Sequence, residues 1–156
     1  MNMTTADKVT DYLISKSIKE GNPLTNKRLQ KLLYYVQAWH LAINKTPLFA
    51  DKIEAWIHGP AIRSVYEKYK GFVASPINVV PNVEVAKELG DTTTKFIDRI
   101  VSAYSKYDTA TLEYMTHAES PWQVARKGLE ANESSNNEIT QDSMLAYYSE
   151  RLTSTN

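Results

Sequence analysis

The spacing of apolar residues along the chain predicts a mainly helical fold. Between residues 25 and 44, apolar side chains recur every three or four positions, and others fall on the opposite side of the same helix. A helix that is apolar almost all round is enclosed by its own domain or by a partner. We therefore expect residues 25–44 to form a central helix, with Thr25 as its N-cap and His40 as a core histidine.

Other segments extend this pattern. Alternation between Ile53 and His58 predicts a short strand, and Pro60 is placed to begin the first turn of the next helix. Ile77–Val80, between two prolines, is a second candidate strand that would pair with the first. Helical periodicity or helix-start signals mark six further segments: residues 4–20, 61–70, 83–104, 108–115, 120–128 and 144–152.

These elements predict a mainly α fold, or α+β at most. We expect residues 1–156 to form a single compact helical domain, with six or seven helices around the central apolar helix and one small two-stranded β element. The N-terminus lacks the order of residues typical of a signal peptide, and no apolar run is long enough to span a bilayer. We therefore expect a cytoplasmic protein without a membrane partner.

The charge pattern argues against a nucleic-acid partner. Formal net charge is zero, whereas proteins that bind phosphate backbones usually carry a positive excess. Residues 1–70 hold 11 Lys and Arg against 6 Asp and Glu, and residues 71–156 hold 7 against 12. The two halves either neutralise each other within one fold, which we favour, or form a bipolar surface that orients a charged partner.

The residues with catalytic potential form no recognisable constellation. The chain contains no cysteine, no glycine-rich phosphate loop, no Gly-x-Ser-x-Gly and no pair of histidines at metal-ligand spacing. His58, at a strand end, is either a general base or partner contact, or it fixes a turn by bonding to backbone. His117 lies between two helices and is explained by tying a helix end. We predict no catalytic residues, no metal and no cofactor.

Aromatic and cationic residues indicate a protein interface instead. Interfaces between proteins are enriched in tyrosine, tryptophan and arginine. Such residues gather in and just before the segment 61–70, although a solvated face also explains its lysines. The candidate partner-binding residues are Trp56, His58, Arg63, Tyr66, Tyr69 and Lys70.

Four stretches in order resemble a known family. They are Lys27–Trp39 with "LQKLLYY", Pro47–Phe49 followed by "EAWIHGP" at Glu54–Pro60, Val65-Tyr66 with Tyr69–Gly71, and Thr116-His117 with Ser120–Trp122. Together they resemble the SocA-like or Panacea antitoxin family, which includes phage-associated GepA-type proteins. The resemblance spans roughly residues 5–150.

The resemblance implies that the chain is the antitoxin of a toxin–antitoxin system. Such a protein neutralises a protein toxin encoded by the adjacent gene, and it does so by direct contact. One member of the family acts as an adaptor that delivers its toxin to an ATP-dependent protease, so this role is an alternative here.

Two further alternatives come from the residues themselves. One is an enzyme that uses His58 or His117 with Glu54 or Glu119. The other is a nucleic-acid binder that uses Lys27, Arg28 and Lys31.

Overall fold

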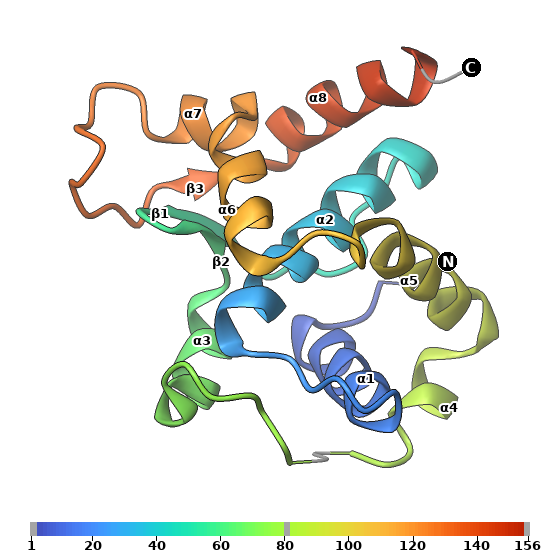
Figure 1. Ribbon diagram of the computed structural model, residues 1–156. Helices are drawn as coiled ribbons and strands as arrows, with labels where there is room; N and C mark the ends of the chain where they lie inside the picture. Colours follow the sequence, from blue (N-terminus) through green and yellow to red (C-terminus); the bar gives the residue numbers. More distant parts are fainter. Residues whose placement is uncertain (1–2, 80–81, 155–156) are drawn as a thin grey trace.

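The computed structural model describes residues 3–79 and 82–154, with side chains up to residue 152. Within these ranges the chain forms eight α-helices, one short 3-10 helix and a small sheet (Figure 1). The α-helices are α1 (Ala6–Lys19), α2 (Asn26–Asn44), α3 (Arg63–Tyr69), α4 (Val85–Leu89), α5 (Asp91–Tyr104), α6 (Thr109–His117), α7 (Ser120–Ala125) and α8 (Gln141–Ser154). The strands are β1 (Ile53–Trp56), β2 (Gly59–Ala61) and β3 (Glu138–Ile139), and the 3-10 helix η1 is Lys70–Phe72.

Helix α2 is the central element, as its apolar pattern predicts. It lies between α8 on one side and α1, α5 and α6 on others, and it also contacts β2 and α3. Thr25 is its N-cap and accepts a hydrogen bond from the Arg28 amide. His40 is fully buried against Phe96 and bonds through Nδ1 to the Thr46 carbonyl, which confirms a core histidine.

Buried polar side chains of α2 hold the neighbouring non-helical segments in place. Gln37 donates to the Phe49 carbonyl at 2.7 Å and accepts from the Leu48 amide at 2.9 Å. Gln30 accepts from the Ile62 amide at 2.8 Å, just after β2. Buried backbone groups need hydrogen-bond partners, so the side-chain amides of Gln30 and Gln37 fix the positions of the segments that pack on α2.

The β element has three strands rather than the two that were predicted. The order is β2-β1-β3, and both pairings are antiparallel. β1 and β2 form a tight hairpin in which Trp56 pairs with Gly59. Pro60 therefore lies within β2, and the prediction that it begins a helix is wrong. Proline has no amide hydrogen to donate within the sheet. The carbonyl of Pro60 accepts a hydrogen bond from Lys31 Nζ at 3.4 Å.

Two other expectations are corrected. Residues 77–79 form no strand; the Ile77 amide bonds to the Leu24 carbonyl, and residue 80 lies outside the described residues. The helix expected from residue 83 to 104 is divided at Gly90 into α4 and α5. Gly90 has φ +86°, a backbone conformation that interrupts a helix. Within the described residues, seven α-helices accompany α2, which agrees with the six or seven expected around the central helix.

A buried carboxylate joins α2, α7 and α8. Glu119 immediately precedes α7 and is 7% exposed. It accepts hydrogen bonds from the hydroxyls of Tyr34, Tyr35 and Tyr148. Burial raises the pKa of Glu119, and the three tyrosine donors oppose that rise. The cluster explains why tyrosines interrupt the apolar surface of the central helix.

None of the helices in the described part of the chain is both long and apolar enough to cross a membrane.

Replacing Glu119 by Ala is expected to lower the free energy of unfolding by about 3 kcal/mol, because three buried hydroxyls lose their acceptor. Glu119→Gln should lose less, because it keeps an acceptor oxygen and removes a buried charge. Urea denaturation monitored by circular dichroism measures both changes. The exposed Glu130→Ala is the matched control and should change stability by less than about 0.5 kcal/mol. Equal stability of wild type and Glu119→Ala would contradict the role of the cluster.

Candidate interaction groove

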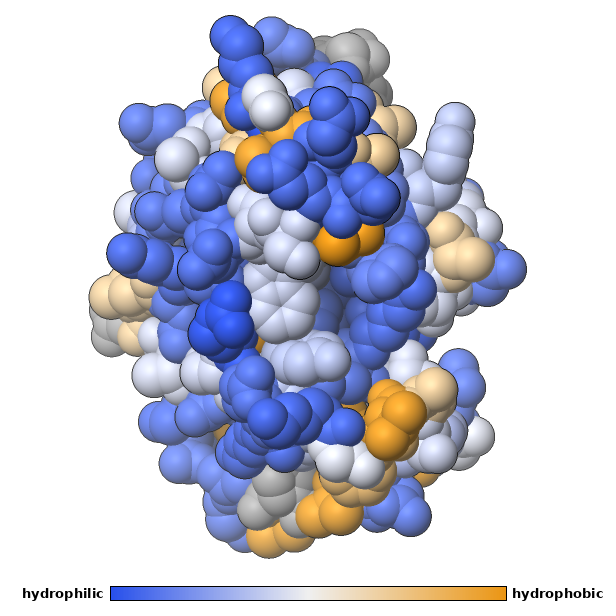
Figure 2. Space-filling model, turned by 90° about the vertical axis from the view of Figure 1, so that its left-hand side faces the viewer, coloured by the Kyte–Doolittle hydropathy of each residue, from blue (hydrophilic) through white to orange (hydrophobic). Residues whose placement is uncertain are grey.

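An open groove lies between the N-terminal half of α2, the β1–β2 hairpin and α3. Its volume is about 950 Å³. The lining comes from residues 26–31 of α2, 56–61 of the hairpin, 63–74 from α3 onward, and 134–136 of the segment before β3. Figure 2 shows this side of the molecule, with a central hollow among residues of intermediate hydropathy and hydrophilic residues around it.

Five of the six predicted partner-binding residues line the groove. They are Trp56, His58, Arg63, Tyr66 and Lys70. The rings of Trp56 and Tyr66 meet edge to face with centroids 4.9 Å apart, and the Arg63 guanidinium lies 5.1 Å from the Trp56 ring centroid. The sequence thus predicted residues from a strand and from the following helix that the fold brings onto one surface.

Tyr69 is the exception and must be removed from the set. It is only 5% exposed and packs beside Phe72 in the core. Positions 66 and 69 are three residues apart on α3, but 66 lies on the groove side and 69 faces inward. Burial, together with the nearby Asp11, raises the pKa of Tyr69 to about 12.

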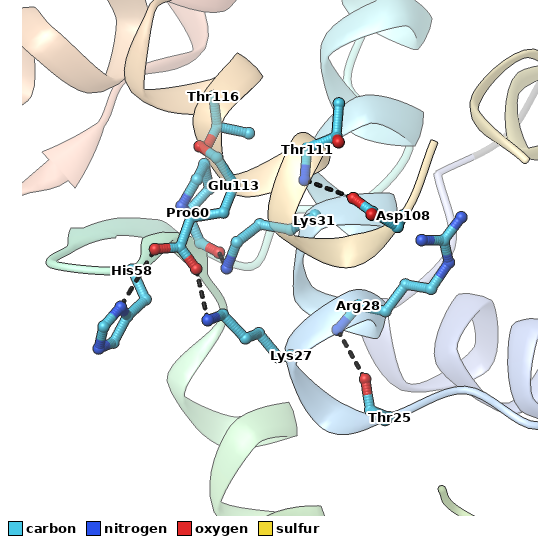
Figure 3. Close-up of polar contacts among 10 residues, drawn as sticks. All are labelled: Thr25, Lys27, Arg28, Lys31, His58, Pro60, Asp108, Thr111, Glu113 and Thr116. Atoms are coloured by element: carbon cyan, nitrogen blue, oxygen red, sulfur yellow. Dashed lines mark hydrogen bonds and ion pairs between the residues drawn. The ribbon is translucent and has the colours of Figure 1, made fainter. Parts of the chain in front are cut away.

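Glu113 joins the hairpin to α2 through two charged contacts. One of its oxygens lies 2.5 Å from Lys27 Nζ and the other lies 3.2 Å from His58 Nδ1 (Figure 3). These contacts lower the pKa of Glu113 despite its partial burial, which opposes the shift. The expected partners of His58 were nearby backbone, Glu54 or Glu119. It is instead oriented by a carboxylate on α6.

Glu54 and Glu119 are committed to other contacts. Glu54 accepts from the Trp56 indole at 2.8 Å and from Arg63 at 2.9 Å. His117 stacks on Trp122 with centroids 4.1 Å apart, and burial lowers its pKa. His117 ends α6, and its backbone carbonyl accepts a hydrogen bond from the Gln123 side chain.

Lys31 lies beneath the hairpin and is 2% exposed. Its burial lowers the pKa of the ammonium to about 8, although Glu113 nearby favours the charged form. Gly59 makes this arrangement possible: a Cβ there would lie 2.7 Å from Lys31 Cε and 2.9 Å from Thr116 Oγ1. Residues from three separate stretches of the chain therefore meet at one point.

The basic residues proposed for nucleic-acid binding do not form a common exposed patch. Lys31 is buried, and Lys27 is paired with Glu113. Arg28 points away from these two in Figure 3, and its guanidinium donates to the Tyr104 carbonyl. This arrangement weakens the nucleic-acid hypothesis.

Comparison with known proteins identifies the family. A family model described as "Antitoxin SocA-like, Panacea domain" matches residues 29–123, which is more than half of the chain. The chain belongs to the SocA-like Panacea antitoxin family. No curated protein and no solved structure matches it.

The matched region contains most of the groove of this Panacea domain. It runs from within α2 through the hairpin and α3 to α7, and so includes Lys31, Gly59 and Glu113. The sequence analysis did not identify Glu113 as a residue of this site, and it did not predict that Lys31 is buried at the base of the groove. One signal for Lys31 was present, because a lysine within a helix predicted to be enclosed on all sides has to be buried.

Gly59→Ala is expected to destabilise the protein by more than about 2 kcal/mol, because φ at residue 59 is +110° and the added methyl group would meet Lys31 and Thr116. Thermal unfolding measures the change. Gly71→Ala is the matched control, since an added Cβ there meets nothing within 4 Å. If both variants unfold at the same temperature as wild type, the close approach at the hairpin is incorrect.

Lys31 should make stability rise with pH in the alkaline range. Its pKa falls from 10.5 in the unfolded chain to about 8 in the folded protein, so the unfolded state binds more protons between these values. The free energy of unfolding should therefore increase by about 1.5 kcal/mol from about pH 8 to 9.5. Urea titrations of wild type and Lys31→Met test this; a rise of equal size in the variant would refute the assignment.

Proposed function

We propose that this protein is the antitoxin of a toxin–antitoxin pair and that it neutralises a protein toxin by direct binding. Its membership of the SocA-like Panacea antitoxin family carries the proposal. Neutralisation by contact requires only that the bound antitoxin cover the toxin's active site or target-binding face. No bond-making step is then required of the antitoxin.

The groove is the surface that supports this function best. It combines two aromatic side chains, Trp56 and Tyr66, with the cations Arg63 and Lys70 and with His58. These residue types anchor protein interfaces, where a few well-packed side chains supply most of the binding energy. A stable interface buries roughly 1,200–2,000 Å² in total, so the toxin would extend beyond the groove onto the surrounding surface.

Co-expression with the product of the adjacent gene tests the function. That product should stop growth when expressed alone, and growth should return when this chain is co-expressed. The two proteins should co-purify as a complex that elutes together in size-exclusion chromatography. A neighbouring product that is harmless, or that never co-purifies with this chain, would refute the proposal. Pulse-chase measurement of toxin half-life separates the two modes: an unchanged half-life fits sequestration, whereas a shortened one fits delivery to a protease.

The oriented His58 is the observation that favours a catalytic alternative, since a histidine held by a carboxylate is an arrangement used in general base catalysis. His58→Ala and Glu113→Gln distinguish the two functions. Under neutralisation by binding, both variants should still protect cells at saturating antitoxin. Loss of protection in a correctly folded His58→Ala protein that still binds the toxin would favour catalysis.

A further inference from the structure

The groove is lined by cations, and the carboxylate partners of two of them lie deeper than the cations themselves. Its lining, within the described residues, includes four Lys and Arg side chains and no Asp or Glu. These cations are Lys27, Lys31, Arg63 and Lys70. A protein with zero net charge therefore has one concave surface whose lining charges are all of one sign.

Side-chain exposure shows which member faces outward in two of the three ion pairs that the lining cations make among the described residues. In the Lys27–Glu113 pair the lysine is 48% exposed and the glutamate 19%. In the Arg63–Glu54 pair the values are 52% and 18%. In both of these pairs the more exposed charge is positive. In the third pair, Lys70–Glu67, both side chains are exposed, at 60% and 47%.

Lys31 adds a buried positive charge that has little direct pairing, although Glu113 lies nearby. Its ammonium makes one hydrogen bond, 3.4 Å from the Pro60 carbonyl oxygen, and no ion pair within 4 Å among the residues the structure describes. A buried cation with so little pairing is costly, and an anion brought into the groove would reduce that cost. The Lys31 ammonium, at the base of the groove, therefore favours an anionic group in the groove.

The rim of the groove also contains exposed apolar surface. Val73 is 80% exposed and has φ +55°, which is a strained conformation for a β-branched residue. Tyr66, another lining residue, is 36% exposed. Strain and an exposed apolar side chain at the same place are typical of a binding surface.

We propose that this groove docks an acidic segment of the toxin, in which carboxylates lie next to an apolar or aromatic side chain. The carboxylates would meet Arg63, Lys70 and Lys27, and the apolar side chain would pack on Tyr66 and Val73. The proposal deepens the antitoxin function and rests on it. It also assigns a use to the basic half of the chain, because nearly all lining residues come from positions 26–74.

A polypeptide fits the groove better than a nucleic acid. Single strands bind by stacking bases on open aromatic faces. Here the Trp56 ring is met by the Arg63 guanidinium and by the edge-to-face Tyr66 ring. The half-buried Trp56 ring is thus already contacted by two neighbouring side chains, and the polar and apolar groups around it match a mixed peptide surface.

Charge reversal within the groove tests the proposal. Arg63→Glu with Lys70→Glu should weaken toxin binding about 10- to 100-fold at low salt, mainly by slowing association, and salt should weaken wild-type binding more than that of the variant. The probe is the purified toxin that the wild-type chain neutralises, with affinity and rates measured by biolayer interferometry. Lys87→Glu with Lys95→Glu, the same change in charge on α4 and α5, is the matched control and should bind within about 3-fold of wild type.

A second pair of variants guards against misfolding. Arg63→Gln with Lys70→Gln removes the charges without reversing them and should give a smaller loss in the same direction, with an unchanged melting temperature. Changing toxin acidic residues to lysine should restore binding to the Glu variant but not improve binding to wild type. Such rescue would support an acidic segment as the occupant.

The outcomes separate the two proposals. If wild type and groove variants all protect cells and bind equally well, the groove proposal is overturned and the antitoxin function stands. A wild-type chain that neither binds nor protects overturns both. The groove proposal also fails if a fluorescent single-stranded oligonucleotide binds through Arg63 and Lys70 while toxin affinity is unchanged by their reversal.

Discussion

The polar side chains buried along α2 are the constraint on which the rest of the structure depends. Asn26 donates to the Tyr66 carbonyl within α3, and Gln30 accepts from the Ile62 amide just before α3. Gln37 donates to the Phe49 carbonyl and accepts from the Leu48 amide, in the segment before the sheet. A buried backbone group without a partner is costly, so each of these side chains admits one position for the segment that it binds. The central helix thereby places the irregular parts of the fold as well as the helices around it.

The groove is a direct result of this arrangement. Lys31, on the same helix, lies under the hairpin, and Gly59 allows the hairpin to approach it. Glu113 then connects the hairpin turn and the start of α2 to α6. Glu113 is the deeper member of both of its pairs, so Lys27 and His58 keep exposed side-chain surface at the groove. A rigid base with a chemically varied rim is well suited to recognising another protein.

Overall charge gives a poor account of what this surface can attract. The chain is neutral, yet Glu113 and Glu54 lie deeper than Lys27 and Arg63, the cations with which they pair. The lining of the groove therefore carries cations although the chain as a whole has no net charge. Antitoxin family membership and a cationic, aromatic groove both support the proposal that the molecule acts through surface complementarity.

The sequence alone determined the elements that depend on neighbouring residues. The 3.6-residue period identified α2, Thr25 was placed to cap it, and five of the six residues predicted from local composition to bind a partner line one groove. The tertiary structure decided what depends on residues distant in the chain. His58 finds Glu113 across 55 positions, β3 joins the sheet from near the C-terminal helix, and Tyr69 turns inward because α3 packs with that side against the core. Local patterns set secondary structure because helix and strand periods are short-range, whereas pairing and burial follow from how the elements pack together.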